Sequence, residues 1–149
     1  MNLNPYWIVG FVDGEGTFYV GINPHQEMSI GYQILPEFRV VQHEHDVQVL
    51  YGLKKHFNCG VVRVNHGDRK EFRVRNIHHL QSIIVPFFTR YPLQTSKKFD
   101  FIKFKKILSL MATDRHLTKE GIIEIIDISS QMNRANKYKS LEIKRLLLE

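Results

Sequence analysis

Cysteine is nearly absent from this sequence, because Cys59 is its only occurrence in 149 residues. A single cysteine excludes an intramolecular disulfide framework and favours a reducing compartment. The sequence also lacks an apolar run long enough to span a bilayer, and it lacks a charged leader followed by an apolar stretch. We therefore expect a soluble, unsecreted, intracellular protein with no membrane partner.

The chain also lacks a Ser/Gly-rich linker and low-complexity tracts, so its length predicts one domain over residues 1–149. Acidic residues are in the minority, and the formal net charge is +6. The first 58 residues hold three Lys or Arg and six Asp or Glu, whereas the remainder holds eighteen and nine. This uneven basic excess points to a polyanionic partner.

A helix is indicated near the N-terminus. Asn4 provides an acceptor for the free N–H groups of a helix start, and Pro5 suits the first helical position. The apolar run Trp7–Val12 continues the helix, and we expect the following glycines to end it. Gly10 and Gly14 lie on one face, where they permit the close approach of a second helix. A helix that is apolar nearly all round is expected to be buried.

Two carboxylates, Asp13 and Glu15, follow at the C-terminal end of this helix, where the carbonyl groups carry partial negative charge. A second copy of the helix would bring further carboxylates close to them. Such a concentration of oxygen ligands is tolerated where a hard divalent cation such as Mg²⁺ binds. The alternative is a capped helix with solvated acidic ends, and these residues alone do not decide between the two.

The segment Ile8–Gly16, with the sequence IVGFVDGEG, resembles the signature motif of the LAGLIDADG homing endonucleases. Glu15 stands at the position of the motif's final Asp. Other segments resemble the family in the same order, namely Pro92–Phe101 (its PLxTxK–DF segment), and Leu117–Gly121 and Met132–Asn133 (its C-terminal helix boundaries). The resemblance covers residues 5–135 and leaves 136–149 as a C-terminal helical tail.

The resemblance implies an α+β fold with the order α-β-β-α-β-β-α, an antiparallel sheet forming a DNA-binding saddle and helices packed on its opposite face. It implies that Glu15 and the backbone carbonyl of Gly14 bind a metal ion. It further implies that Gln42 orients solvent and that Lys97 stabilises phosphate charge or polarises water, so that Glu15, Gln42 and Lys97 form the catalytic set. Asp46 departs from the basic residue that one branch of the family has at this position.

The chain contains one copy of the motif, whereas cutting both DNA strands takes two acidic sites. The resemblance therefore implies a homodimer with its two-fold axis between the signature helices, and a pseudo-palindromic target. In such a dimer, Asp13 is expected to cap the partner's helix. The expected interface residues are Trp7, Gly10, Phe11, Asp13 and Gly14.

Alternation of apolar and polar residues predicts two hairpins, with strands at Thr17–Asn23, Tyr32–Gln42, Val61–Asn65 and Lys70–Arg75. Pro36 must then lie at a bulge or an edge. Glu71-Phe72-Arg73-Val74 repeats Glu37-Phe38-Arg39-Val40, which suggests two similar hairpin–helix units. Helices are expected at Asp46–Phe57, Ile77–Val85 (capped by Asn76 and ended or kinked by Pro86), Ser96–Met111, Lys119–Met132 and Ser140–Leu148.

The outward face of these strands is rich in the side chains that read base edges. Arg forks bind guanine, and Asn or Gln binds adenine, in a major groove that admits a two-stranded ribbon. A solvated sheet face is the alternative from the pattern alone, and the resemblance favours groove recognition. The residues expected to contact DNA are Tyr19, Asn23, Gln33, Glu37, Arg39, Arg63, Asn65, Glu71, Arg73 and Arg75.

Two other clusters carry less weight. His43, His45, His56 and Cys59 are of metal-ligating types, but their spacing matches no common zinc module. The lysines at 97, 98, 103, 105 and 106 match the wet face of an amphipathic helix, with Lys97 singled out by the resemblance.

The sequence thus predicts an intron-encoded homing endonuclease that cuts double-stranded DNA sequence-specifically as a homodimer and uses no small-molecule substrate. Mg²⁺ is the expected cofactor, Mn²⁺ is expected to substitute for it, and Ca²⁺ is expected to support binding only. The expected compartment is a chloroplast, a mitochondrion or a prokaryotic cytoplasm. The alternatives are an intron maturase and a non-cleaving DNA-binding protein on the same scaffold, and retention of Glu15 favours the nuclease over both.

Overall fold

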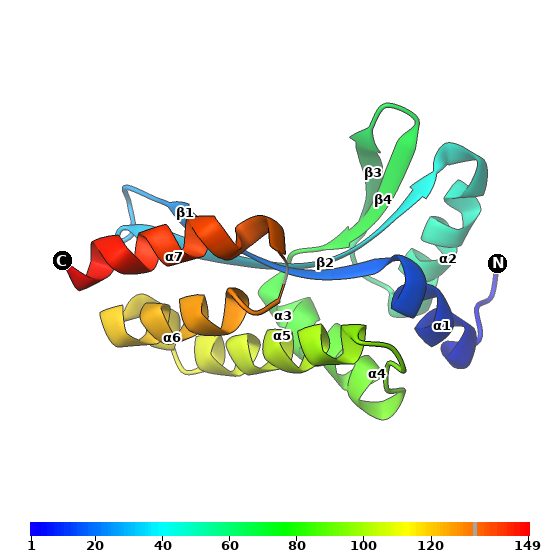
Figure 1. The fold of residues 1–149 in the computed structure, drawn as a ribbon. Helices are drawn as coiled ribbons and strands as arrows, with labels where there is room; N and C mark the ends of the chain where they lie inside the picture. Colours follow the sequence, from blue (N-terminus) through cyan, green and yellow to red (C-terminus); the bar gives the residue numbers. More distant parts are fainter. Residues whose placement is uncertain (133) are drawn as a thin grey trace. The chain divides into compact units, whose positions relative to one another are not determined.

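The computed structural model describes residues 1–132 and 134–149. Its strands form one four-stranded antiparallel sheet in the order β1-β2-β4-β3, and the predicted α-β-β-α-β-β-α order is confirmed (Figure 1). The elements are α1 (Pro5–Glu15), β1 (Gly16–Pro24), β2 (Tyr32–His43), η1 (Glu44–Asp46), α2 (Val47–Phe57), β3 (Val61–His66), β4 (Arg69–Val74), α3 (Ile77–His79), the π-helical turn η2 (Leu80–Ile84), α4 (Val85–Arg90), α5 (Lys97–Ala112), η3 (Arg115–Leu117), α6 (Lys119–Ser129) and α7 (Arg134–Leu148).

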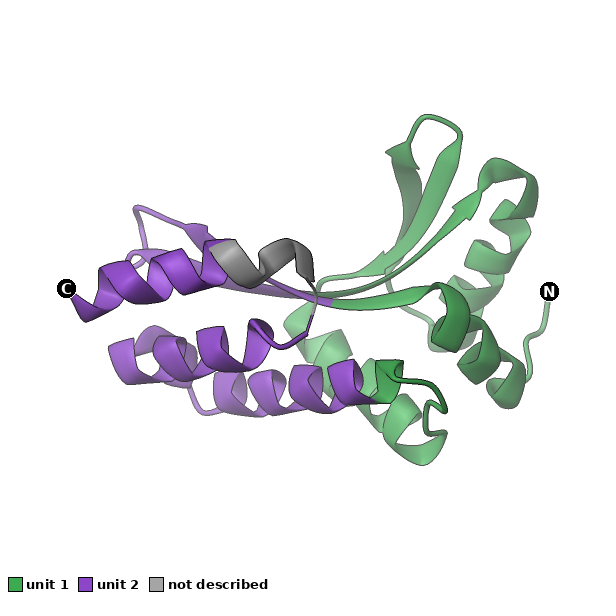
Figure 2. Ribbon diagram, viewed as in Figure 1, with its two compact units in different colours: residues 1–18, 37–98 green, residues 19–36, 99–149 purple. Residues whose placement is uncertain are grey.

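The chain divides into two compact units (Figure 2). Unit 1 comprises residues 1–18 and 37–98, and unit 2 comprises residues 19–36 and 99–149. Strands β1 and β2 each contribute residues to both units. The single domain expected from the sequence stays a prediction.

The core of unit 1 is built from aromatic side chains that alternate along the strands. Phe38 of β2 and Phe72 of β4 are fully buried on one face of the sheet. Phe57 of α2 stacks on Phe72 with ring centroids 6.1 Å apart, and Phe88 of α4 lies 5.5 Å from Phe38. Helices α2 and α4 therefore cover the apolar face, as predicted, and the other face of β2, β3 and β4 carries the polar residues.

Unit 2 contains the pair of helices α6 and α7, which pack against each other. Thr118 caps α6 by accepting a hydrogen bond from the N–H of Gly121 at 3.0 Å. Gly121 is required there because a Cβ at this position would collide with the carbonyl of Arg115. The predicted helix start at Lys119 is therefore confirmed, and Lys144 ties α7 to Asp127 of α6 with an ion pair of 2.6 Å.

Three predicted helix boundaries differ from the structure by more than one residue. The helix after Asn76 does not end at Val85 but continues through Pro86 to Arg90. The wide turn η2 directly precedes α4, so Pro86 lies in the first turn of a new helix, where its missing N–H costs no bond. Helix α6 ends at Ser129, three residues before Met132, and α7 begins at residue 134 instead of Ser140. Asn133, at the predicted helix boundary, lies outside the described residues.

The structure also bears on the expected burial of the first helix and on the expected place of Pro36. Helix α1 is buried only on its Ile8, Val9 and Val12 side, while Tyr6 and Trp7 are 74% and 45% exposed. Pro36 lies inside β2, but β4 pairs with β2 only from Phe38 to His43, so the prolyl nitrogen interrupts no bond in that ladder. Within the part of the chain that the structure describes, none of the helices has the length and apolar character needed to cross a bilayer.

Candidate active site and nucleic-acid interface

The C-terminal end of α1 presents the acidic residue of the motif to solvent. Asn4 accepts a hydrogen bond from the Tyr6 N–H at 2.8 Å and Pro5 opens the helix, as predicted. The helix runs to Glu15, which is exposed, and Gly16 follows in an extended conformation. Gly16 is needed for close packing, since a Cβ there would lie 2.6 Å from Val12 Cγ1.

Lys97, at the start of α5, reaches this end of α1. Its Nζ donates hydrogen bonds to the carbonyl of Val12 at 3.1 Å and to the carbonyl of Gly16. A cation at a helix C-terminus is favourable because it offsets the partial negative charge of the last carbonyls. The structure thus places the ammonium group of Lys97 against backbone atoms on both sides of Gly14 and Glu15, and its catalytic role stays a prediction.

Asp13 is hydrogen-bonded within its own chain, and the expectation that it also caps a partner helix stays a prediction. Its carboxylate accepts hydrogen bonds from the N–H groups of Gln94 (2.9 Å) and Thr95 (3.1 Å) and from the Thr95 hydroxyl (2.7 Å). Burial alone would raise the pKa of Asp13. The hydrogen bonds from Gln94 and Thr95, together with the charge of Lys97, outweigh burial and lower it. Asp13 therefore anchors the segment before α5, and with it Lys97, to α1.

We expect Asp13→Asn to lower the free energy of unfolding by about 1–2 kcal/mol near pH 7, because an amide replaces an ionised acceptor of several N–H and O–H groups. Folding lowers the pKa of Asp13 below its ordinary value of 3.8, so its contribution is present above that value and is lost as the pH falls through the folded pKa. The difference between wild type and variant should shrink at pH 3. Urea unfolding at both pH values measures it. Asp46→Asn is the control, because Asp46 makes no capping hydrogen bond, and an unchanged difference at pH 3 would contradict this assignment.

Glu15 and Gly14 are chemically suited to a hard divalent cation. The Glu15 carboxylate is exposed, and the Gly14 carbonyl belongs to the last helical turn, where carbonyls have no intrahelical donor. The described residues contain no group of three or more His, Cys, Asp or Glu placed to hold a metal ion. The two oxygens therefore fit only part of a coordination shell, which further oxygen ligands would have to complete.

Gln42 lies near the end of β2, opposite Lys70 of β4. It shares the sheet face of Val40 and Phe72, and it is half-buried. Its role beside the cleavage site stays a prediction. The neighbouring His43 is engaged elsewhere, since its ring bonds the Asp68 carboxylate at 2.8 Å and accepts the N–H of His45 at 3.1 Å.

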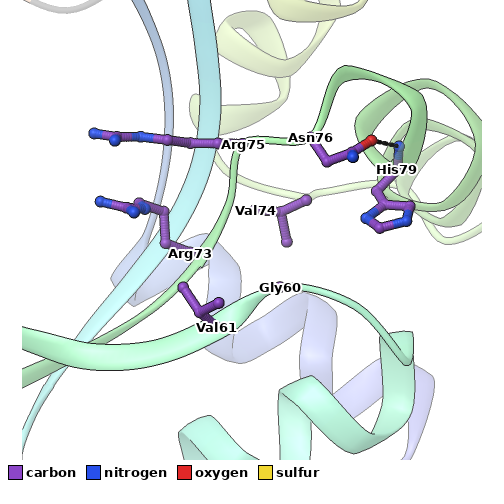
Figure 3. A pocket seen from close by; sticks show the side chains of 7 residues that line it. All are labelled: Gly60, Val61, Arg73, Val74, Arg75, Asn76 and His79. Atoms are coloured by element: carbon purple, nitrogen blue, oxygen red, sulfur yellow. Dashed lines mark hydrogen bonds between the residues drawn. The ribbon is translucent and has the colours of Figure 1, made fainter.

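The polar face of β2, β3 and β4 gathers arginine side chains in unit 1. Cross-strand pairs place Arg39 opposite Arg73 and Arg63 opposite Glu71, so these four predicted DNA-contacting residues share one face. Arg73 and Arg75 extend side by side from β4 and the residue after it (Figure 3). They border a pocket of about 300 Å³ that is also lined by Val61, Asn76 and His79.

The structure corrects the predicted exposure of two members of this face. Glu37 and Glu71 are only 6% and 5% exposed, because arginine side chains lie over them. Asn65 is exposed and its amide lies 3.4 Å from Glu71. In unit 2, Asn23 is bonded by Lys139 at 2.9 Å, and Tyr19 and Gln33 are half-buried.

Sequence reasoning missed Arg69, which shares the polar face because it pairs with His43. The predicted strand begins one residue later, at Lys70, and therefore leaves Arg69 out. The signal was present, since Arg69 stands two residues before Glu71 and two-residue spacing keeps side chains on one face.

The pKa of Arg73 is lowered from its ordinary value. Burial lowers it most and the charges of Arg75 and Arg63 lower it further, while the charges of Glu71 and Glu37 raise it.

Comparison with known proteins places these features in context. A family model described as LAGLIDADG endonuclease matches residues 8–108. Probable intron-encoded endonuclease 2 of Neurospora crassa is 38% identical over 133 residues, which is 88% of this chain and 29% of the relative. DNA endonuclease I-CeuI of Chlamydomonas moewusii is 28% identical over 86% of this chain and 62% of its own length. The chain thus spans less than two thirds of either curated relative.

Two solved structures are similar over most of the chain. The homing endonuclease I-TnaI has a TM-score of 0.90 and 52% sequence identity, covering 97% of this chain and 99% of its own. I-SmaMI, solved bound to an uncleaved DNA target in the presence of calcium ions, has a TM-score of 0.88 and 34% identity, covering 89% of this chain and 46% of its own.

Proposed function

The chain belongs to the LAGLIDADG endonuclease family, and we propose from that premise that it hydrolyses both strands of a specific DNA site. The proposal rests on the arrangement at the end of α1. There the carboxylate of Glu15 is exposed, and the carbonyl of the next residue, Gly16, accepts a hydrogen bond from Lys97. I-SmaMI, which is similar over 89% of this chain, was solved with DNA. Several relatives are named as intron-encoded, and we propose an intron setting for this gene too, with an organelle as the expected compartment.

Recognition is assigned to the polar face of β2, β3 and β4. Arg39, Arg63 and Arg73 share this face, and guanidinium forks pair with the O6 and N7 atoms of guanine in the major groove. The strands that carry this face pair antiparallel, and a two-stranded antiparallel ribbon can insert into that groove. Base contacts of this kind specify the sequence, whereas contacts to phosphate only position the protein.

Hydrolysis is assigned to the end of α1. Glu15 and the Gly14 carbonyl would hold a divalent cation, proposed to be Mg²⁺, which activates water and stabilises charge on the phosphate. Lys97 holds a positive charge beside the same backbone, where it would offset negative charge that develops on the scissile phosphate. Gln42 is proposed to orient the attacking water.

Assembly is assigned to the exposed side of α1. Trp7 stacks on Phe11 with ring centroids 5.0 Å apart, and Trp7 is 45% exposed. A Cβ built on Gly10 or Gly14 meets no atom within 4 Å, so both glycines face open space in the protomer. A second copy packed on this face would bring two Glu15 residues together, one for each DNA strand. We therefore propose a homodimer and a pseudo-palindromic site.

We expect Gly10→Leu to abolish the dimer without unfolding the protomer. The added side chain has room in the protomer, but it would keep two α1 helices from approaching closely. Sedimentation at micromolar concentration should give twice the 17.6 kDa chain mass for wild type and the chain mass for the variant. Gly10→Ala, which adds one methyl group, should weaken the dimer only partly. A monomeric wild type would contradict the proposed assembly.

The metal dependence tests the proposed reaction. A site selected for binding in Ca²⁺ should stay intact in Ca²⁺, because this larger ion prefers looser coordination, and it should be cut after exchange into Mg²⁺ or Mn²⁺. Cleavage in the presence of a chelator would contradict the assignment of Glu15 and Gly14 to a metal site.

A further inference from the structure

Two carboxylates are buried on a sheet face that also carries several arginines. Glu37 is 6% exposed and Glu71 is 5% exposed, whereas the side chains of Arg63 and Arg75 are each 51% exposed. Burying a carboxylate is costly unless cations and hydrogen bonds compensate it. Among the described residues, Glu37 Oε2 finds no hydrogen-bond donor. Contact with solvent therefore does not explain why glutamates occupy these two positions, and another role must.

Each glutamate lies at ion-pair distance from arginine groups. Glu71 Oε1 is 3.6 Å from Arg63 Nε and 3.8 Å from Arg73 Nη1, and Glu37 Oε1 is 3.5 Å from Arg75 Nη2. These distances exceed the usual length of a charge-assisted hydrogen bond, about 2.7–2.9 Å. The carboxylates thus attract the guanidinium groups without forming short hydrogen bonds in any of these three contacts.

The same arrangement occurs twice in the sheet. The repeated segments Glu37–Val40 and Glu71–Val74 lie on neighbouring strands, and they pair antiparallel with Arg39 opposite Arg73. Each repeat therefore puts a buried glutamate and, two residues later, an arginine on the same polar face. Both buried glutamates also lie at ion-pair distance from arginines, Glu71 from Arg63 and Arg73 and Glu37 from Arg75, which indicates a shared role in organising those side chains.

We propose that Glu37 and Glu71 are positioning residues for DNA recognition and do not themselves contact bases. Glu71 holds Arg63 and Arg73, and Glu37 holds Arg75, in the orientations that read base edges. Their negative charge also opposes the attraction of the arginines for phosphate, which is the same for every sequence. The glutamates would thus raise discrimination and lower general affinity. This inference rests on the proposed function as a sequence-specific DNA endonuclease.

The electrostatic surroundings agree with this role. Burial and the neighbouring charges of Arg75 and Arg63 lower the pKa of Arg73, and Glu71 and Glu37 raise it. The two carboxylates thus relieve repulsion among closely spaced cations. Without them, the arginine side chains would be expected to separate into several conformations, and each would pair with guanine less selectively.

The first test compares Glu71→Gln and Glu37→Gln with wild type, using binding in Ca²⁺ to the selected site and to a random duplex of equal length. Removing the charge while keeping the shape should raise affinity for the random duplex roughly two- to tenfold. The ratio of specific to random affinity should fall about tenfold or more. Glu120→Gln makes the same charge change on the exposed first turn of α6, and it should leave the ratio unchanged.

The second test maps which base positions lose preference. Glu37→Gln should relax the positions that Arg75→Ala relaxes, and Glu71→Gln those that Arg63→Ala and Arg73→Ala relax. A merely structural role would instead lower the melting temperature and weaken all DNA equally. Because the two glutamates are separate sites, a folding defect in one variant leaves the other as the test.

Unchanged base preferences in both glutamine variants would overturn the inference, as would a change confined to positions that the arginine variants leave intact. That second outcome would mean that a glutamate reads a base directly. A wild type that does not distinguish the selected site from random DNA would instead contradict the proposed function.

Discussion

We expect Glu15→Gln to bind its DNA site and to cut neither strand. The substitution keeps the shape of the side chain but removes the charge that would hold a divalent cation at the end of α1. Cleavage should fall at least about 10³-fold, because metal ions activate water and stabilise phosphate charge together. Binding without metal should be unchanged or slightly tighter, since one carboxylate no longer repels phosphate.

The measurement is plasmid cleavage in Mg²⁺ beside a gel shift on the same site. Glu120→Gln is the control, because it removes an exposed carboxylate from α6 and should cut normally. Full cleavage by Glu15→Gln would move the active site away from α1. Loss of both binding and cleavage would show instead that the substitution disrupts the fold or the dimer.

The second large effect is expected for Lys97→Met, which should reduce cleavage about 10²- to 10³-fold while leaving DNA affinity nearly unchanged. The methionine keeps the apolar stem but removes the ammonium group that bonds the carbonyls of Val12 and Gly16. Single-turnover rates at saturating protein separate this effect from binding.

Lys98→Met provides a matched control, since the neighbouring lysine is exposed and carries the same charge. An equal loss from both substitutions would mean that the general positive potential matters and the position of Lys97 does not. A fall in the melting temperature of Lys97→Met with normal cleavage would assign Lys97 a purely structural role at the helix end.

Much of the fold could be predicted because local signals and tertiary packing agree. Asn4 and Pro5 start α1 as their capping chemistry requires, and Asn58 ends α2 in the left-handed region with φ 53°. The predicted helix end at Val85, before Pro86, was wrong, because the π-helical turn η2 precedes the proline and the helix continues after it. Such a turn depends on packing around it, so local sequence carries no signal for it.

The candidate site could also be predicted only in part. Periodicity alone could place Arg63, Glu71 and Arg73 on one face, and the cross-strand register bears this out. Periodicity could not show that Glu71 is buried, because the exposure of a strand residue depends on how long neighbouring side chains fold over it. It also could not show that Asp13 bonds Gln94, some eighty residues away, since that contact follows from tertiary structure.

In the proposed reaction, two copies of the chain cut DNA with one α1 carboxylate each. Mapping both cut positions on a library of random duplexes in Mg²⁺ tests this most directly. We predict double-strand breaks whose two cuts are related by the two-fold symmetry of a pseudo-palindromic consensus, and Glu15→Gln should produce none of them. Cuts on one strand only, an asymmetric consensus, or binding without any cleavage in Mg²⁺ or Mn²⁺ would contradict it.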